Sequence, residues 1–263
     1  MIFIKFPVNS NRVLVYHKID SRPELGITCI HPKQFEKQIK FLADQGYQFL
    51  TLEKLVASKS VNPKTLAITF DDGYQDIYKY ALPILKKYNA PATVFIITDY
   101  IGKENTWDVN LGWIRYEHLN EREIESLIDA GWEINSHGIS HCSLRGLDEE
   151  GIIRELSRSK TILQERFRQP VRFFAIPFGN VNERIRRLAI KTGYQGIAGF
   201  YPVKYYKNPL PPGIILRLAV YRTDSLKSIK QKLSNNGALL KEVLKQNAIN
   251  LCSNATIIVN SLR

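Results

Sequence analysis

AITFDDGYQD, residues 67–76, is the stretch of sequence that decides the fold. Its first four residues form a short apolar run that predicts a buried strand. The strand ends directly at Asp71 and Asp72, and Gly73 then lets the backbone turn sharply. In a parallel α/β barrel, functional side chains lie where strands end and loops begin. The stretch therefore predicts a strand with a polar site at its end.

The two adjacent carboxylates can take two different roles. Neighbouring strand residues point to opposite faces, so one carboxylate can hold a cation while the other moves a proton. Alternatively, an Asp that precedes a helical segment caps that helix. A cap needs only one carboxylate, so Asp71 and Asp72 leave function and capping both open at this point.

Strand-like and helix-like segments alternate along the rest of the chain. This order indicates a parallel sheet wrapped by helices, and seven or eight such units in 263 residues favour a barrel over an open sheet. No low-complexity linker divides the chain, so we expect a single domain over residues 1–263, with the proline-containing stretch 204–213 as a loop. Strands are expected at residues 13–17, 49–52, 66–70, 92–97, 132–135, 172–176, 196–200, 214–221 and 255–260, and helices at 31–46, 75–88, 117–130, 148–168 and 182–192.

The composition is that of an ordinary globular protein, with 44% apolar and 24% charged residues and a net charge of +12. A positive surface suits anionic partners, such as nucleic acid, acidic glycans or a membrane face. No recognition-helix or zinc-finger pattern accompanies the charge, so we expect no nucleic-acid binding. Peripheral association with a membrane or an anionic glycan stays open.

The sequence leaves the cellular location undetermined. It contains no apolar stretch of membrane-spanning length, and its N-terminus lacks a signal-peptide cleavage site. We therefore expect a cytoplasmic protein or one peripheral to the cell envelope. Cys29, Cys142 and Cys252 are far apart and odd in number, which predicts neither a disulfide framework nor a cysteine-based zinc site.

The stretch EINSHGISHCSL, residues 133–144, places two histidines four positions apart. His137 and His141 can lie on one side of a helical turn or at two points of a tight loop, and either arrangement can converge on one metal ion. Two imidazoles and one carboxylate make a three-ligand site for zinc or a similar ion, with positions left open for water and substrate. The alternative is two surface histidines in a polar loop.

The stretch FFAIPFGN, residues 173–180, is a strand that runs into a rigid aromatic turn. Pro177, Phe178 and Gly179 can line a pocket wall and offer backbone N–H groups to a developing oxyanion. Taken alone, such a turn is a common way to end a strand.

Together, TFDDGY, SHGISH and a strand ending in PFG resemble the NodB-type polysaccharide deacetylases, carbohydrate esterase family four, and within it the poly-N-acetylglucosamine deacetylase branch. The resemblance covers about residues 16–221. It implies a distorted (β/α) barrel of about seven parallel strands that removes N-acetyl groups from amino sugars in a glycan or glycolipid. It also implies a divalent metal, usually Zn²⁺ with Co²⁺, Ni²⁺ or Fe²⁺ possible, held by Asp72, His137 and His141. Asp71 would be the base, and the backbone N–H of Phe178 would stabilise the oxyanion.

The chain departs from the common family pattern at two positions. Many members carry an Arg where this chain has Ala175, and many take their acid from a late His, whereas no His follows His141 here. His17, at the end of the strand VLVYH, is the expected acid, as the poly-N-acetylglucosamine branch uses a similar Tyr-His; the alternative is a core histidine. Arg217 is expected to replace the missing Arg by pairing with Asp71.

The remaining candidates have less specific expectations. Tyr74 either reaches into the site or packs under the loop, and Trp113 and Tyr116 are either rim aromatics or core residues. His31 is expected to cap a helix or to be a surface group, and His118 to be exposed within a polar helix.

Two rival functions stay open. The first changes the substrate to chitin-like oligomers, peptidoglycan or another amide. The second is a catalytically inactive glycan-binding module with the same fold, which the retention of both aspartates and both motif histidines argues against.

Overall fold

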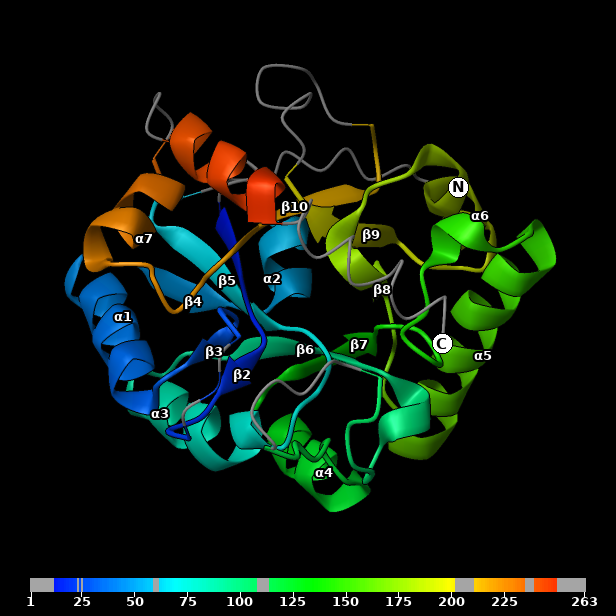
Figure 1. Cartoon of the computed structure of the whole chain (residues 1–263), viewed down its shortest axis with the longest axis horizontal. Helices are drawn as coiled ribbons and strands as arrows, with labels where there is room; N and C mark the ends of the chain where they lie inside the picture. Colours follow the sequence, from blue (N-terminus) through cyan, green and yellow to red (C-terminus); the bar gives the residue numbers. More distant parts are fainter. Residues whose placement is uncertain are drawn as a thin grey trace.

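The computed structural model describes residues 12–22, 24, 26–58, 62–107, 114–201, 211–234 and 239–249. Within these residues, seven parallel strands close into a barrel surrounded by helices (Figure 1), which confirms the predicted fold class. Each strand pairs with the next, and β1 pairs with both β5 and β10, which closes the ring. The barrel strands are β1 (Val13–Tyr16), β5 (Thr65–Phe70), β6 (Ala92–Ile96), β7 (Glu133–Ser136), β8 (Phe173–Ala175), β9 (Gly196–Phe200) and β10 (Ile214–Ala219).

The seam beside β1 carries the irregular features of the barrel. Strand β4 (Gln48–Leu50) pairs with the beginning of β5, and β1 pairs with the remainder. The β1–β10 ladder has two residue pairs, Leu14 with Leu218 and Val15 with Ala219. Gln246 extends the hydrogen bonding of β10, because its carboxamide accepts from the N–H of Ala219 (3.0 Å) and donates to the carbonyl of Arg217 (3.3 Å). A two-stranded sheet, β2 (Lys18–Ile19) with β3 (Cys29–Ile30), follows β1.

Most of the helices begin at polar capping residues. His31 caps the first helix by accepting from the N–H of Lys33, as predicted, and Asp148 caps the fifth. Asn120 and Glu123 form a capping box. The helices are α1 (Pro32–Asp44), α2 (Leu52–Ala57), α3 (Leu82–Lys87), α4 (Glu121–Asp129), α5 (Glu149–Phe167), α6 (Glu183–Lys191), α7 (Leu226–Lys232) and residues 239–249, with 3₁₀ turns η3 (Thr98–Tyr100), η4 (Leu144–Gly146) and η5 (Pro177–Gly179).

Three predicted boundaries are wrong. The strand expected at 49–52 ends at Leu50, because Thr51 caps α2. The helix expected at 117–130 begins at Glu121, because Asn120 caps it and the preceding residues pair with other loops. The helix expected at 75–88 opens as a π-helix, η2 (Ile77–Ala81), before α3. The early part of α3 contains Pro83, which has no N–H for the regular helical ladder.

Two further expectations fall outside the described residues. These are the strand at 255–260 and most of the loop at 204–213. Within the described chain, no helix combines the length and the apolar character that a membrane span requires.

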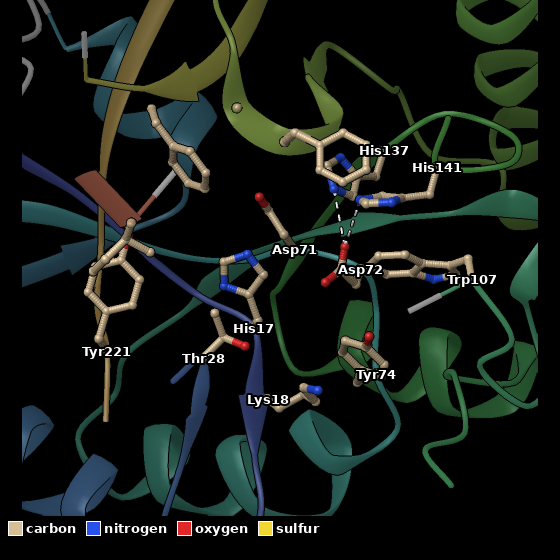
Figure 2. Close-up of a pocket in the computed structure, with 14 residues that line it drawn as sticks. His17, Lys18, Thr28, Asp71, Asp72, Tyr74, Trp107, His137, His141 and Tyr221 are labelled. Carbon is tan, nitrogen blue, oxygen red and sulfur yellow. Dashed lines mark ion pairs between the residues drawn. The ribbon is translucent and has the colours of Figure 1, made fainter. Parts of the chain in front are cut away.

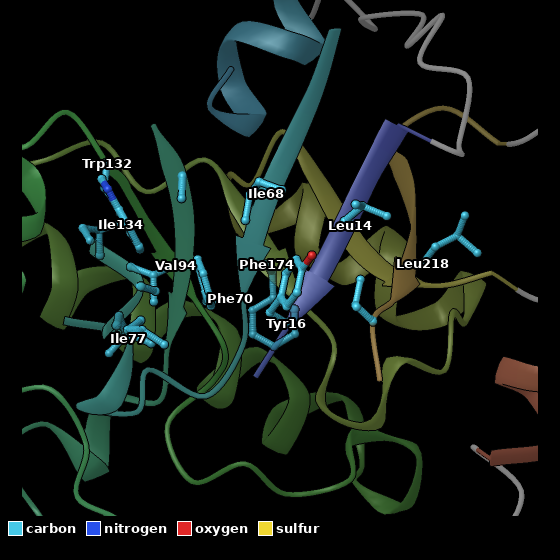
Figure 3. Packing of buried hydrophobic residues seen from close by; sticks show 14 of the residues in the cluster. Leu14, Tyr16, Ile68, Phe70, Ile77, Val94, Trp132, Ile134, Phe174 and Leu218 are labelled. Atoms are coloured by element: carbon cyan, nitrogen blue, oxygen red, sulfur yellow. The ribbon is translucent and has the colours of Figure 1, made fainter. Parts of the chain in front are cut away.

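Alternate strand residues build two apolar layers. Leu14, Ile68 and Val94 belong to the layer between the barrel and the helices (Figure 3). The alternating set fills the barrel interior, where Ala67 and Ala198 are small.

Candidate metal centre and active site

A pocket opens at the carboxyl ends of the barrel strands (Figure 2). The empty space in the pocket and at its open mouth amounts to about 770 Å³. Most of the predicted site residues line it. The lining residues are His17, Lys18, Thr28, Asp71, Asp72, Tyr74, Trp107, His137, His141, Phe178, Gly179, Phe200, Tyr221 and Ile249.

Strand alternation brings His17 and Asp71 to this pocket. Val13 and Ala67 belong to the interior layer, and every second residue after each of them continues on the same face. The N–H of Asp71 donates to the carbonyl of Tyr16 (3.0 Å), so the β1–β5 pairing extends to the point where the two side chains emerge. Both residues therefore face the same rim, as predicted.

The turn after Asp71 aims the second carboxylate in another direction. Asp72 has a φ of 69°, in the left-handed region that non-glycine residues rarely adopt. Gly73 also has a φ of 69°, and a Cβ at this position would lie 2.8 Å from Ile96 Cδ1. Only glycine therefore fits at position 73, and this tight turn directs Asp72 toward the histidines.

Asp72, His137 and His141 form a buried group that can hold a metal ion (Figure 2). The Oδ1 atom of Asp72 lies 3.2 Å from Nε2 of His137 and 3.3 Å from Nε2 of His141. The Nδ1 atom of His137 donates to the carbonyl of Ala175 (2.9 Å), because a carbonyl can only accept, and Nε2 is therefore the ring nitrogen that faces Asp72 and can bind an ion when deprotonated. The predicted ligands are thus brought together.

The charge states of this group also fit a divalent cation. Burial lowers the pKa of His141 to about 3, so its imidazole is neutral and offers a lone pair. Burial alone would raise the pKa of Asp72, but its hydrogen bond with His137 and the electrostatic contributions of the surrounding histidines together outweigh that effect and lower it. One carboxylate and two imidazoles suit zinc and similar ions, and three ligands leave positions open.

The two histidines lie on a tight loop rather than a helical turn. Glu155 on α5 holds this loop, since its Oε2 accepts from the N–H of Ile139 (2.7 Å) and its Oε1 accepts from the hydroxyl of Ser140 (2.8 Å). His141 adopts a φ of 61° at the end of the loop. This backbone brings His141 back beside His137.

Arg217 pairs with Asp71 inside the barrel, which is the contact that the sequence predicted. Its Nη1 and Nη2 atoms donate to the two carboxylate oxygens at 2.5 and 2.7 Å, and both side chains are buried. The guanidinium also lies over the ring of Phe95, 5.0 Å from its centroid. Burial disfavours the ionised carboxylate, but the charge and hydrogen bonds of Arg217, together with the contributions of His137 and His17, outweigh this and lower the pKa of Asp71.

His17 lies between Asp71 and Thr28 at the pocket (Figure 2). Its Nδ1 atom is buried and has no hydrogen-bond partner among the described residues. Burial lowers the pKa of His17, although the charges of Asp72 and Asp71 act in the opposite direction. An unpartnered ring nitrogen beside two carboxylates is available to a ligand.

The PFG turn forms another wall of the pocket. Phe178 has a φ of 63°, and its ring centroid lies 4.9 Å from that of His141. A Cβ on Gly179 would lie 2.1 Å from Phe200 Cδ2, so this position also requires glycine. Pro177 is buried and is absent from the pocket lining.

The prediction for His118 is wrong, and the prediction for Trp113 and Tyr116 can be tested only for Tyr116. His118 is buried, not exposed, and it pairs with Tyr74 in an isolated antiparallel bridge. Tyr116 is buried and packs edge-on against Tyr74, which lines the pocket. Trp113 lies outside the described residues.

Trp107 is an aromatic pocket residue that the sequence analysis missed. Its ring centroid lies 3.8 Å from that of His141. It belongs to an irregular segment with neither helical nor strand periodicity, so no pattern marked it. The other unpredicted lining residues are Lys18, Thr28, Phe200, Tyr221 and Ile249.

The fold and the site define a class: a parallel α/β barrel with a buried Asp-His-His group, able to hold a metal, at the carboxyl ends of its strands. A family model described as polysaccharide deacetylase matches residues 58–197. YxkH of Bacillus subtilis (strain 168), whose name places it with the polysaccharide deacetylases, is 36% identical over 187 residues, which are 70% of this chain and 62% of YxkH. The chain belongs to the polysaccharide deacetylase family.

Other relatives agree with this assignment. The poly-beta-1,6-N-acetyl-D-glucosamine N-deacetylase of Staphylococcus aureus (strain MSSA476) is 30% identical over 220 residues, 73% of each chain. A polysaccharide deacetylase of Bacillus cereus superimposes with a TM-score of 0.70 at 27% identity, over 84% of this chain and 68% of that one. IcaB from Ammonifex degensii, at 21% identity, supports the fold, with a TM-score of 0.69 over 85% of this chain and 95% of that one.

Proposed function

We propose that this protein is a metal-dependent hydrolase that removes N-acetyl groups from N-acetylated amino sugars in a glycan or glycolipid. One observation carries the proposal: a buried Asp72–His137–His141 group lies directly beside an aspartate held by a buried arginine. A deacetylase of this kind needs a metal site and a general base in contact with the same substrate group.

The proposed metal is Zn²⁺, with Co²⁺, Ni²⁺ or Fe²⁺ as alternatives, and its ligands would be Asp72, His137 and His141. When bound, such an ion acts as a Lewis acid that polarises a carbonyl and acidifies water. The protein side of the site fits this role, because the hydrogen bond from His137 to Ala175 fixes the ring orientation before any ion arrives.

Asp71 is the proposed general base. Its lowered pKa keeps it ionised at neutral pH, and the two hydrogen bonds from Arg217 fix the plane of the carboxylate. The remaining lone pairs of the oxygens can accept the proton of the attacking water. Arg217 is therefore proposed to orient the base.

His17 is the proposed general acid that protonates the departing amine. An acid must carry its proton, and burial lowers the pKa of His17. We therefore expect acetate release to decline with rising pH from below the ordinary histidine pKa of 6.5. The backbone N–H of Phe178 is the proposed donor to the oxyanion, and Tyr74, Pro177 and Gly179 shape that wall.

The relatives and the pocket support the proposed substrate class. The staphylococcal relative is named for its action on poly-beta-1,6-N-acetyl-D-glucosamine. Trp107, Phe178 and Phe200 line the pocket of this chain beside polar groups, and such a mixture suits a sugar ring with an apolar face. We propose no nucleic-acid partner, and only peripheral association with a membrane or an anionic glycan.

The test is acetate release from a panel of N-acetylglucosamine oligomers, after chelation and after readdition of zinc or cobalt. We expect metal-dependent release that Asp71→Asn reduces by a factor of at least about 100, in the range usual for general-base catalysis, and that His17→Ala reduces strongly. Full activity of His17→Ala would remove the acid assignment alone. Oligomer binding with neither metal uptake nor acetate release would instead indicate the inactive glycan-binding module.

A further inference from the structure

His118 contacts the turn that carries Asp72. Its Nδ1 atom lies 2.9 Å from the backbone carbonyl oxygen of Asp72, and its ring stacks on Tyr74 with centroids 4.8 Å apart. The side chain is buried. Nothing in the proposed chemistry uses this histidine, so its contacts need another explanation.

The hydrogen bond has a defined direction. A carbonyl oxygen can only accept, so Nδ1 of His118 carries the proton and Nε2 keeps a lone pair. Nε2 is buried and has no hydrogen-bond partner among the described residues. An unpaired buried acceptor is unfavourable. His118 therefore keeps its hydrogen bond to Asp72 even though Nε2 is left without a partner among the described residues.

The backbone around this bond is fixed from both sides. The N–H of Leu119 donates to the carbonyl of Gly73 (2.9 Å), and the N–H of Gln75 donates to the carbonyl of Glu117 (2.8 Å). The segment around His118 therefore pairs with the turn that follows Asp72. Asp72 itself holds a φ of 69°, a conformation that persists in a non-glycine residue only when its surroundings enforce it.

We propose that His118 is a positioning residue for the metal centre. Its hydrogen bond to the Asp72 carbonyl orients the peptide between positions 72 and 73. That orientation keeps Asp72 in its left-handed conformation with the carboxylate directed at His137 and His141. The inference rests on the proposed metal site and assigns a further residue to its assembly.

Two substitutions separate the hydrogen bond from the stacking. His118→Phe keeps a ring against Tyr74 and removes the donor, whereas His118→Asn removes the ring and places an amide N–H close to the position of Nδ1. His118→Gln places its amide near Nε2 instead, so Asn and Gln form a matched pair of similar polarity. The readouts are the Zn²⁺ dissociation constant of the metal-free protein, by chelator competition, and the visible spectrum with Co²⁺.

We expect His118→Phe and His118→Gln to weaken Zn²⁺ binding about tenfold, the lower range for a group that orients a metal ligand, and to alter the Co²⁺ spectrum. His118→Asn should stay within about twofold of the wild type. Equal affinities of wild type and His118→Phe would overturn the proposal, as would equal losses in the Asn and Gln variants. If wild type itself takes up no metal, the metal-centre proposal fails first, and this outcome is distinct from an unchanged variant.

Discussion

The two ends of the barrel both bury polar side chains, but they satisfy them differently. At the amino ends of the strands, Glu133 in β7 accepts hydrogen bonds from the N–H of Glu53 (2.9 Å), the hydroxyl of Thr93 (3.0 Å) and the amide of Asn135 (2.6 Å). The carbonyl oxygen of that same amide accepts from the N–H groups of residues 172 and 173. This group at the amino ends is a closed hydrogen-bond network that joins three strands and α2.

At the carboxyl ends, buried polar atoms lack such partners. Nδ1 of His17, Nδ1 of His141 and Nε2 of His118 have none among the described residues. Asp72, His141 and Phe178 also carry positive φ angles. Unpaired groups and strained backbone persist at functional sites. The difference therefore indicates that the polar group at the amino ends of the strands stabilises the fold, whereas the group at the carboxyl ends serves the chemistry.

The largest effect is expected from breaking the ion pair in the barrel interior. Arg217→Met leaves Asp71 buried without its cation, so the free energy of unfolding should fall by about 3–5 kcal/mol and acetate release should be lost. Chemical denaturation and the acetate assay measure the two effects. The double variant Arg217→Met/Asp71→Asn should recover most of the stability and none of the activity; a stable single variant would contradict this account.

A substitution at the amino ends of the strands should lower stability and leave the rate of acetate release unchanged. Glu133→Ala leaves Thr93 and Asn135 without their shared acceptor, so we expect a loss of about 2 kcal/mol in the free energy of unfolding. The kcat/KM for acetate release should stay within twofold of wild type at a temperature where the variant is folded. Glu133→Gln keeps one acceptor and should lose less. A fall in kcat/KM that parallels the loss of stability would show that the polar network at the amino ends also supports catalysis.

The loop that carries His137 and His141 offers a more selective test of the site at the carboxyl ends of the strands. Glu155→Ala frees the backbone at Ile139 and Ser140, so Zn²⁺ affinity should fall about tenfold with only a modest loss of stability. Glu150 lies on the same helix, exposed and paired only with Arg154 among the described residues. Glu150→Ala is therefore the matched control and should leave affinity unchanged. Equal Zn²⁺ affinities in both variants would show that the histidine loop keeps its conformation without Glu155.

The smallest effect concerns Asp76, a buried carboxyl close to the DDG turn. Burial, with a further contribution from Asp20, raises the pKa of Asp76 from 3.8 to about 8, although the N–H of Ile19 and the charges of Lys18 and Arg22 favour the ionised form. The folded state then keeps a proton that the unfolded state releases, so stability from this group falls as pH rises through this interval.

The Asp76→Asn variant removes that dependence. Its Tm relative to wild type should rise by at least about 2 °C between pH 5 and pH 8, the shift that about 1 kcal/mol produces in a domain of this size. Thermal scans of both proteins across the interval supply the measurement. A constant difference in Tm would mean that the carboxyl of Asp76 is ionised in the folded protein throughout.

Local patterns were enough to predict most of the barrel and the metal group. Apolar runs mark the strands, and the motifs at their ends place Asp72, His137 and His141 on one rim, because parallel strands end on the same side. The Asp71–Arg217 contact followed from the resemblance, since Ala175 leaves the family's usual arginine missing. The strands needed only residue type and position, whereas the full ligand set and the Asp71–Arg217 pair also needed the resemblance.

Contacts between irregular segments could not be predicted in this way. His118 stands in the charged stretch EHLNEREIE, whose helical pattern hides the Asn120 cap and therefore the change from loop to helix. Trp107 reaches the site from a loop, and Gln246 reaches the backbone of β10 from a distant helix. No spacing in the sequence links either of them to the motifs. Such contacts depend on three-dimensional proximity alone.

The closing seam of the barrel has a consequence for the order of folding. Leu14 pairs with Leu218, so the ring closes between the first and the last of its strands. A nascent chain emerges from its N-terminus, and Asp71 is synthesised long before Arg217. Until β10 docks, the aspartate has no guanidinium partner and cannot remain ionised in an apolar interior. The proposed base therefore gains its arginine partner only once β10 has joined the barrel.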